Sequence, residues 1–172
     1  LTTNGARCVT GSDDGVGRVW CVETECLLHA LEGHDGRVTK VQVLGGPESR
    51  DQRRGTPWAG CVVTASSDHT VRLWDASSSE DAKVTIDVGE APLSMCYNYK
   101  GDGLAVAGRK RVVFVDPRTG GDPHTTIKET HQGSKGQRIV WLRDQNYLFT
   151  VGSTKAAARP NRPKTTDPSC QP

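Results

Sequence analysis

Residues 62–75 read VVTASSDHTVRLWD, and this stretch decides the fold. Its first part is apolar and β-branched, and its last part alternates apolar and polar residues up to Trp74. A segment rich in Ser and Asp separates the two parts. Two such runs around a short polar segment indicate a β-hairpin. The stretch therefore predicts two antiparallel strands, over residues 61–66 and 70–75.

The same pattern occurs twice more in the chain. Residues 8–21 (CVTGSDDGVGRVWC) align with residues 62–75 without a gap, and residues 104–116 (LAVAGRKRVVFVD) form a copy whose turn is one residue shorter. The third copy ends 41 residues after the second, whereas 54 residues separate the ends of the first two, because a hydrophilic segment at 45–60 intervenes. Repeated hairpins at this spacing predict an all-β chain of successive antiparallel units.

The second hairpin carries the residues of a known repeat. Gly33-His34 precedes it, and Trp74-Asp75 closes it with Trp74 41 residues after Gly33. This opening and close resemble the WD40 repeat, whose copies form the four-stranded antiparallel blades of a β-propeller. The resemblance implies a partial propeller of about three and a half of seven blades. Because Leu1 begins in the middle of the pattern, we expect the chain to be a fragment of a longer protein.

The domain organisation follows from the repeats. We expect propeller blades over residues 1–154, divided at about 1–31, 32–82, 83–124 and 125–154. Residues 155–172 hold four prolines and few apolar side chains, which predicts a disordered or aberrant tail. Strands are predicted at 6–11, 16–22, 25–31, 38–44, 61–66, 70–75, 83–88, 92–98, 104–107, 111–115, 125–129, 137–142 and 147–151.

The WD40 resemblance also implies a set of structural residues. In such blades a His, a Ser or Thr, an Asp and a Trp form a buried hydrogen-bonded tetrad, because a buried indole N–H needs an acceptor. The third copy lacks the Asp and has Val115 in place of the Trp, so it has lost the tetrad. The matching residues are His34, Thr64, Asp68 and Trp74 in the second copy, and Thr10, Asp14 and Trp20 in the first.

The later part of the chain resembles the coronin family. Residues 94–104 (SMCYNYKGDGL) carry an aromatic-Asn pair before a Gly turn, residues 113–120 (VFVDPRTG) end in Asp-Pro-Arg, and residues 131–142 (HQGSKGQRIVWL) are similar to a coronin His-Glu-Gly segment. The Arg-Ile-Val-Trp sequence at residues 138–141 is more similar to the long coronins, which have tandem propellers. The resemblance implies a non-catalytic cytoplasmic scaffold that binds actin filaments and regulates the actin cytoskeleton or associated membrane traffic. The alternative is a WD40 adaptor of another family that presents partners to a ligase or signalling complex.

Partner contacts on a propeller usually lie on the face made by the turns that flank the tetrad. The third-copy turn has three consecutive cations, which would attract an acidic partner surface such as that of actin. We expect the 45–60 segment to be a loop on the opposite face. The candidate partner-binding residues are Asp35, Arg37, His69, Arg109, Lys110 and Arg111.

Composition and motifs exclude several other functions. The net charge of +2 includes +3 from residues 155–172, so the remaining residues sum to −1 and offer no basic face for nucleic acid. No window of 18 apolar residues predicts a transmembrane segment. Phosphate-loop, zinc-protease and nucleophile-elbow motifs are missing, so we expect neither an enzyme nor a cofactor.

The Cys and His residues do not predict a metal site. Six cysteines occur without a C-x-x-C pair, which predicts free thiols in a reducing compartment. His124 and His131 lie seven residues apart without a carboxylate or Cys at metal-ligand spacing. We expect both to be surface or turn histidines.

Overall fold

The structure is a computed structural model that describes residues 6–44, 61–78, 81–98, 103–116, 125–131, 135–142 and 147–153. These ranges contain thirteen strands and no helix. Every strand expected from the sequence is present, with ends that differ by two residues at most, so the all-β prediction is confirmed. The predicted loop at 45–60 and the predicted tail at 155–172 lie outside the described residues.

The strands form four antiparallel sheets, with the orders β1-β2-β3, β4-β5-β6-β7, β8-β9-β10-β11 and β12-β13. Alternating apolar and polar residues favour strands whose two faces meet different surroundings. In chain order the strands are β1 (Arg7–Gly11), β2 (Gly17–Cys21), β3 (Leu27–Leu31), β4 (Val38–Val43), β5 (Cys61–Ser66), β6 (Thr70–Asp75), β7 (Val84–Asp87), β8 (Ser94–Tyr97), β9 (Leu104–Ala107), β10 (Arg111–Val115), β11 (Thr125–Lys128), β12 (Arg138–Trp141) and β13 (Leu148–Val151).

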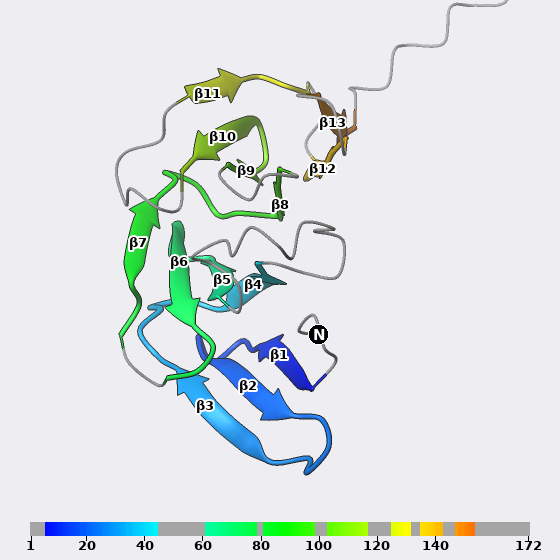
Figure 1. The fold of residues 1–172 in the computed structure, drawn as a ribbon. Helices are drawn as coiled ribbons and strands as arrows, with labels where there is room; N and C mark the ends of the chain where they lie inside the picture. The colour runs from blue at the N-terminus through cyan, green and yellow to red at the C-terminus, as the bar shows by residue number, and fades with distance from the viewer. Residues whose placement is uncertain are drawn as a thin grey trace, which may run out of the picture.

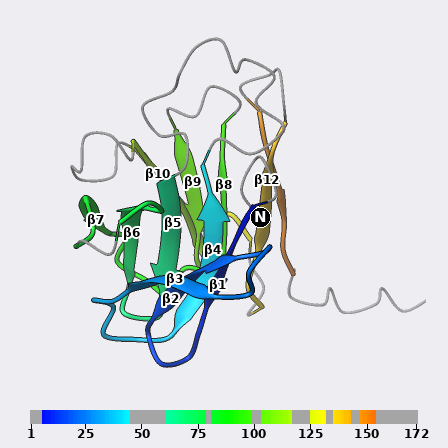
Figure 2. The same ribbon diagram turned by 60° about the horizontal axis from the view of Figure 1, so that its bottom comes forward.

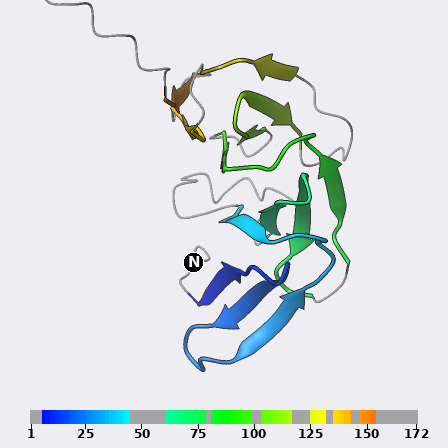
Figure 3. The same cartoon turned by 180° about the vertical axis from the view of Figure 1, so that it is seen from behind.

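The four sheets follow one another along an arc. Figure 1 shows β4, β8 and β12 on the inner side of this arc and β3, β7 and β11 on the outer side. The view from behind shows the same curve reversed (Figure 3). In Figure 2 the strands of the second and third sheets stand side by side. This is the arrangement of consecutive propeller blades, each presenting its first strand to the centre.

The sheet boundaries differ from the unit boundaries expected at 82/83 and 124/125. β7 pairs with β6 as the outer strand of the second sheet, and β11 pairs with β10 as the outer strand of the third. The backbone N–H of Lys83 donates to the carbonyl of Leu73 at 2.8 Å, so the chain turns back along β6 before it crosses to the next blade. The edge of β6 would otherwise expose unpaired backbone groups.

Three apolar layers lie between successive sheets. Val19 and Leu31 pack against Val62 and Trp74 between the first and second sheets. The layer between the second and third sheets is the largest, and both faces of β5 are buried. Ala105 and Val112 pack against Ile139 between the third and fourth sheets. Burial of each large aliphatic side chain contributes roughly 1.5–3 kcal/mol, so these layers hold the arc together.

The far face of the fourth sheet is apolar and open. Val140, Phe149 and Val151 are 58%, 57% and 54% exposed, although all three lie in strands. The inner-facing residue of the same sheet, Ile139, is only 4% exposed. The fourth sheet therefore has one buried face and one apolar face in contact with water.

Candidate functional site

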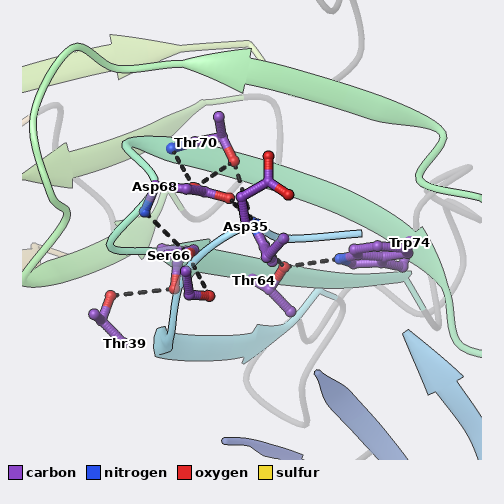
Figure 4. A network of polar contacts seen from close by, with 10 residues as sticks. Asp35, Thr39, Thr64, Ser66, Asp68, Thr70 and Trp74 are labelled. Carbon is purple, nitrogen blue, oxygen red and sulfur yellow. Dashed lines mark hydrogen bonds and ion pairs between the residues drawn. The ribbon is translucent and has the colours of Figure 1, made fainter. Parts of the chain in front are cut away.

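The tetrad residues of the second sheet form a continuous chain of hydrogen bonds. The Trp74 indole N–H donates to Thr64 Oγ1 at 2.8 Å, and Thr64 Oγ1 lies 2.7 Å from His34 Nε2. His34 Nδ1 in turn lies 2.8 Å from Asp68 Oδ2. Figure 4 shows Trp74, Thr64 and Asp68 arranged along this line. The structure thus brings together four residues that span 40 positions of sequence, from His34 to Trp74.

The charges of this network fix the direction of each hydrogen bond. Burial raises the pKa of the Asp68 carboxyl, but hydrogen bonds from Thr70 and His34 outweigh it and lower the pKa to about 2. Burial lowers the pKa of His34 below its ordinary value and outweighs the hydrogen bond to Asp68. At neutral pH an ionised Asp68 can only accept, so Nδ1 of a neutral His34 donates to it. Nε2 then accepts from the Thr64 hydroxyl, which accepts from Trp74.

Two glycines allow the segment around His34 to reach the network. Gly33 has a φ of 139°, and a Cβ there would lie 2.5 Å from Arg72 Nη1. A Cβ on Gly36 would lie 2.6 Å from Ser67 Oγ, and the Gly36 carbonyl accepts a hydrogen bond from Ser66 Oγ at 2.8 Å. A Cβ would come too close to its neighbours at both positions, and the positive φ at Gly33 also favours glycine. The sequence Gly-His-Asp-Gly therefore positions His34 against the β5–β6 turn.

The first sheet contains only part of this arrangement. The Trp20 indole donates to Thr10 Oγ1 at 2.9 Å, as in the second sheet, but Thr10 is exposed. Asp14 does not join them, because its carboxylate binds Arg18 at 2.6 Å and accepts from the Val16 N–H at 2.9 Å. The Arg18 hydrogen bond is the largest cause that lowers the pKa of Asp14 to about 2.

The third sheet has apolar residues at the corresponding positions. Val106 and Val115 share the face toward the second sheet and are 2% exposed. These positions correspond to Thr64 and Trp74, once the turn that is one residue shorter is taken into account. Both polar partners have been replaced, so no buried polar group on this face has lost its acceptor.

The fourth sheet contains a pair that sequence reasoning missed. His131 follows β11 as His34 follows β3, and its Nε2 lies 3.1 Å from Thr150 Oγ1 on β13. His131 lies in the connection after β11 and is half-buried, and its hydrogen bond to Thr150 was not predicted from the sequence. The signal was a His after an outer strand followed by a Thr in the second strand of the next unit. His124 lies outside the described residues.

The candidate partner-binding residues lie in the connections at the tetrad end of the sheets. We call Asp35, Arg37, His69, Arg109, Lys110 and Arg111 the tetrad rim. Asp35, Arg37, His69, Arg109 and Lys110 are exposed.

Arg111 differs from the other residues of the tetrad rim. It is half-buried, and its Nε lies 3.4 Å from Glu90 Oε1. The run of three cations therefore presents two exposed side chains, Arg109 and Lys110, while Arg111 is held beside the carboxylate of Glu90. A partly exposed ion pair of this kind contributes about 0–1 kcal/mol to the stability of the fold, so its main effect is to offset the charge of Arg111.

Across the part of the chain that the structure describes, no group of three or more His, Cys, Asp or Glu side chains could hold a metal ion. The described ranges also contain no helix that is long and apolar enough to cross a membrane.

Comparisons with known proteins identify the fold to which this geometry is similar. The profile described as WD domain, G-beta repeat matches residues 25–75, which span the tetrad. A chain in the crystal structure of a mitotic checkpoint complex shares the fold with a TM-score of 0.72 and 19% identity, over 90% of this chain and 45% of that one.

Two kinds of curated relative match most of the chain. A coronin-like protein of Saccharomyces cerevisiae is 27% identical over 91% of this chain, and coronin-like protein crn1 of Schizosaccharomyces pombe is 29% identical over 87%. The ribosome biogenesis protein WDR12 homolog of Drosophila yakuba is 27% identical over 89%. The chain spans 24% of the length of the two coronin-like proteins and 37% of the third. The matching profile, the tetrad and the blade order together show that the described sheets form part of a WD40-type β-propeller fold.

Proposed function

We propose that the chain is part of a coronin-like scaffold that binds actin filaments and regulates the actin cytoskeleton or associated membrane traffic in the cytoplasm. WD40 propellers are in general non-catalytic platforms for protein partners, and the two coronin-like relatives align with most of the chain. The similarity to the coronin Asp-Pro-Arg and His-Glu-Gly segments supports the same reading.

The observation that carries the proposal is the exposure of the tetrad rim. Arg37, Arg109 and Lys110 are exposed at the same end of neighbouring blades. Hydrogen bonds hold their backbones in place, since the Arg37 carbonyl accepts from Ser67 N at 3.0 Å and the Lys110 carbonyl accepts from Thr130 N at 3.1 Å. Fixed cations of this kind attract an acidic partner surface.

A second candidate function is a scaffold in ribosome biogenesis. The WDR12 homologs match the chain with the same 27% identity as the coronin-like protein of Saccharomyces cerevisiae and over a similar share of it. Under this second candidate, the chain would be part of a WD40 adaptor outside the coronin family.

Co-sedimentation with filamentous actin tests the first candidate. We expect the protein that contains this chain to pellet with filaments at low salt and less strongly at physiological salt, because exposed charges are screened beyond about 8 Å there. Fractionation of cell extract on a sucrose gradient tests the second. Absence from the actin pellet together with migration in the pre-ribosomal fractions would favour ribosome biogenesis and reject the actin proposal.

A further inference from the structure

Two cysteines face each other across the hairpin formed by β2 and β3. Trp20 pairs with Leu27, so the next pair in the register is Cys21 and Cys26. The Cys21 N–H donates to the Cys26 carbonyl at 2.9 Å, which extends the pairing to the last position before the turn. Residues opposite one another in an antiparallel pair direct their side chains to the same face.

The backbone spacing at this position suits a disulfide. Hydrogen-bonded opposite residues have Cα atoms about 5.5 Å apart. Disulfides join residues whose Cα atoms are about 4.4–6.8 Å apart. The typical Cα separation of such a pair lies within the range that a disulfide spans.

The turn between the two cysteines brings both thiols to one residue. Cys26 Sγ donates to the Thr24 carbonyl at 3.3 Å. The Thr24 hydroxyl, followed by the backbone N–H groups of Thr24 and Glu23, lowers the pKa of the Cys21 thiol and outweighs burial and the Glu23 charge, which raise it. A thiolate at Cys21 thus sits among donors that stabilise it, beside a second sulfur.

The other described cysteines lack this combination. Burial raises the pKa of Cys61, and burial raises the pKa of Cys96 to about 11. Cys26 is exposed and Cys21 is half-buried, so small oxidants can reach the pair from water. Reactive cysteines combine thiolate character with access, often beside a resolving cysteine.

We propose that Cys21 and Cys26 form a peroxide-sensitive dithiol site. The Cys21 thiolate attacks one oxygen of hydrogen peroxide, the O–O bond breaks, and the departing hydroxide takes a proton to become water. Cys21 is thereby oxidised to a sulfenic acid. The Cys26 thiolate then attacks this sulfur, the S–O bond breaks, and the second hydroxide leaves as water after protonation. Two thiols and one peroxide become one disulfide and two waters, and the β2–β3 turn is locked covalently.

Peptide mapping of the full chain after peroxide treatment tests the site. Trypsin cuts after Arg18 and Arg37, so residues 19–37 form one peptide that holds both cysteines and no internal Lys or Arg. We expect this peptide to lose the mass of two hydrogen atoms before Cys61 or Cys96 reacts. Treatment in urea, which abolishes the strand register, should remove this preference.

Single replacements assign the role of each sulfur. In Cys26→Ser, dimedone should trap a sulfenic acid at Cys21, whereas Cys21→Ser should give no adduct at Cys26 under the same peroxide dose. Thr24→Val should slow oxidation by about twofold to tenfold, since the thiolate fraction falls tenfold for each unit of pKa while its nucleophilicity rises. Thr24→Ser should restore the rate. Oxidation of Cys21 no faster in the folded chain than in urea, or a wild-type peptide 19–37 without a disulfide, would overturn the proposal.

Discussion

Trp74 donates its indole N–H to Thr64 at 2.8 Å while both side chains are at most 1% exposed, whereas Trp20 and Thr10 make the same bond at 2.9 Å with Thr10 exposed. Thr64→Val should therefore leave the Trp74 N–H and His34 Nε2 unsatisfied, at about 1–3 kcal/mol each. Thr10→Val is the matched control and should change the free energy of unfolding by about 0.5 kcal/mol or less, because water replaces the hydroxyl. Denaturant unfolding of both variants measures the difference, and equal effects would contradict it.

Asp68→Ala should destabilise the protein strongly. The carboxylate accepts from Thr70 N and Thr70 Oγ1, both at 2.8 Å, and from His34 and Asp35 N. Each donor left unsatisfied costs about 1–3 kcal/mol. Asp13→Ala, an exposed Asp of the β1–β2 turn, is the control and should leave the thermal midpoint nearly unchanged. An unaltered midpoint in Asp68→Ala would show that the network contributes no stability.

Stability should fall with acid in two steps. His34 has a folded pKa below its ordinary 6.5, so the unfolded chain binds the proton first and stability decreases as the pH falls below about 6.5. Asp68 has a folded pKa of about 2 against an ordinary 3.8, so its contribution of about 2 kcal/mol is present above pH 4 and is lost as the pH falls toward 2. Urea titrations at a series of pH values should show both steps. Asp68→Asn should make the lower step smaller, with the remainder coming from carboxylates such as Asp14 whose pKa is also lowered, and a profile identical to that of the wild type would contradict this assignment.

Charge reversal on the tetrad rim should weaken partner binding without loss of stability. Arg109→Glu combined with Lys110→Glu removes two exposed cations, while the hydrogen bond from Thr130 N to the Lys110 carbonyl does not depend on the side chain. We expect less co-sedimentation with actin filaments at an unchanged melting temperature. Lys128→Glu, an exposed position on β11, is the control. Binding that persists at low and at physiological salt would show that this turn is not the contact.

The chain in isolation should self-associate through its fourth sheet. Phe149 and Val151 are more than half exposed on β13, and β13 has one strand neighbour, β12, among the described strands. Apolar strands at an open edge are templates for pairing. Sedimentation velocity should show species larger than a monomer, and Phe149→Lys should shift the distribution toward the monomer. A monomeric wild-type chain with one cooperative melt would refute this expectation.

The sequence predicts the strands well because their alternation is local. Residues 62–75 contain both strands of a hairpin and its turn, so no distant contact is needed to place them. The pairing of β7 with β6 was harder to predict, since it depends on which neighbouring edge is open. The ion pair between Arg111 and Glu90 joins residues 21 positions apart that no pattern marks, whereas the bond between His131 and Thr150 is marked only by comparison between repeats.

Val106 and Val115 have a consequence for how such blades change over time. Loss of Thr64 alone would leave the Trp74 N–H and His34 Nε2 without partners, and loss of Trp74 alone would leave a cavity beside Thr64, so intermediates with one replacement are less stable than either end state. This face of a blade can therefore carry either the polar set, as with Thr64 and Trp74, or the apolar set, as with Val106 and Val115. A change from one set to the other passes through less stable intermediates. The third sheet keeps four strands but has Val106 and Val115 where the second sheet has Thr64 and Trp74. A count of WD40 signature residues will therefore underestimate the number of blades wherever a blade carries the apolar set.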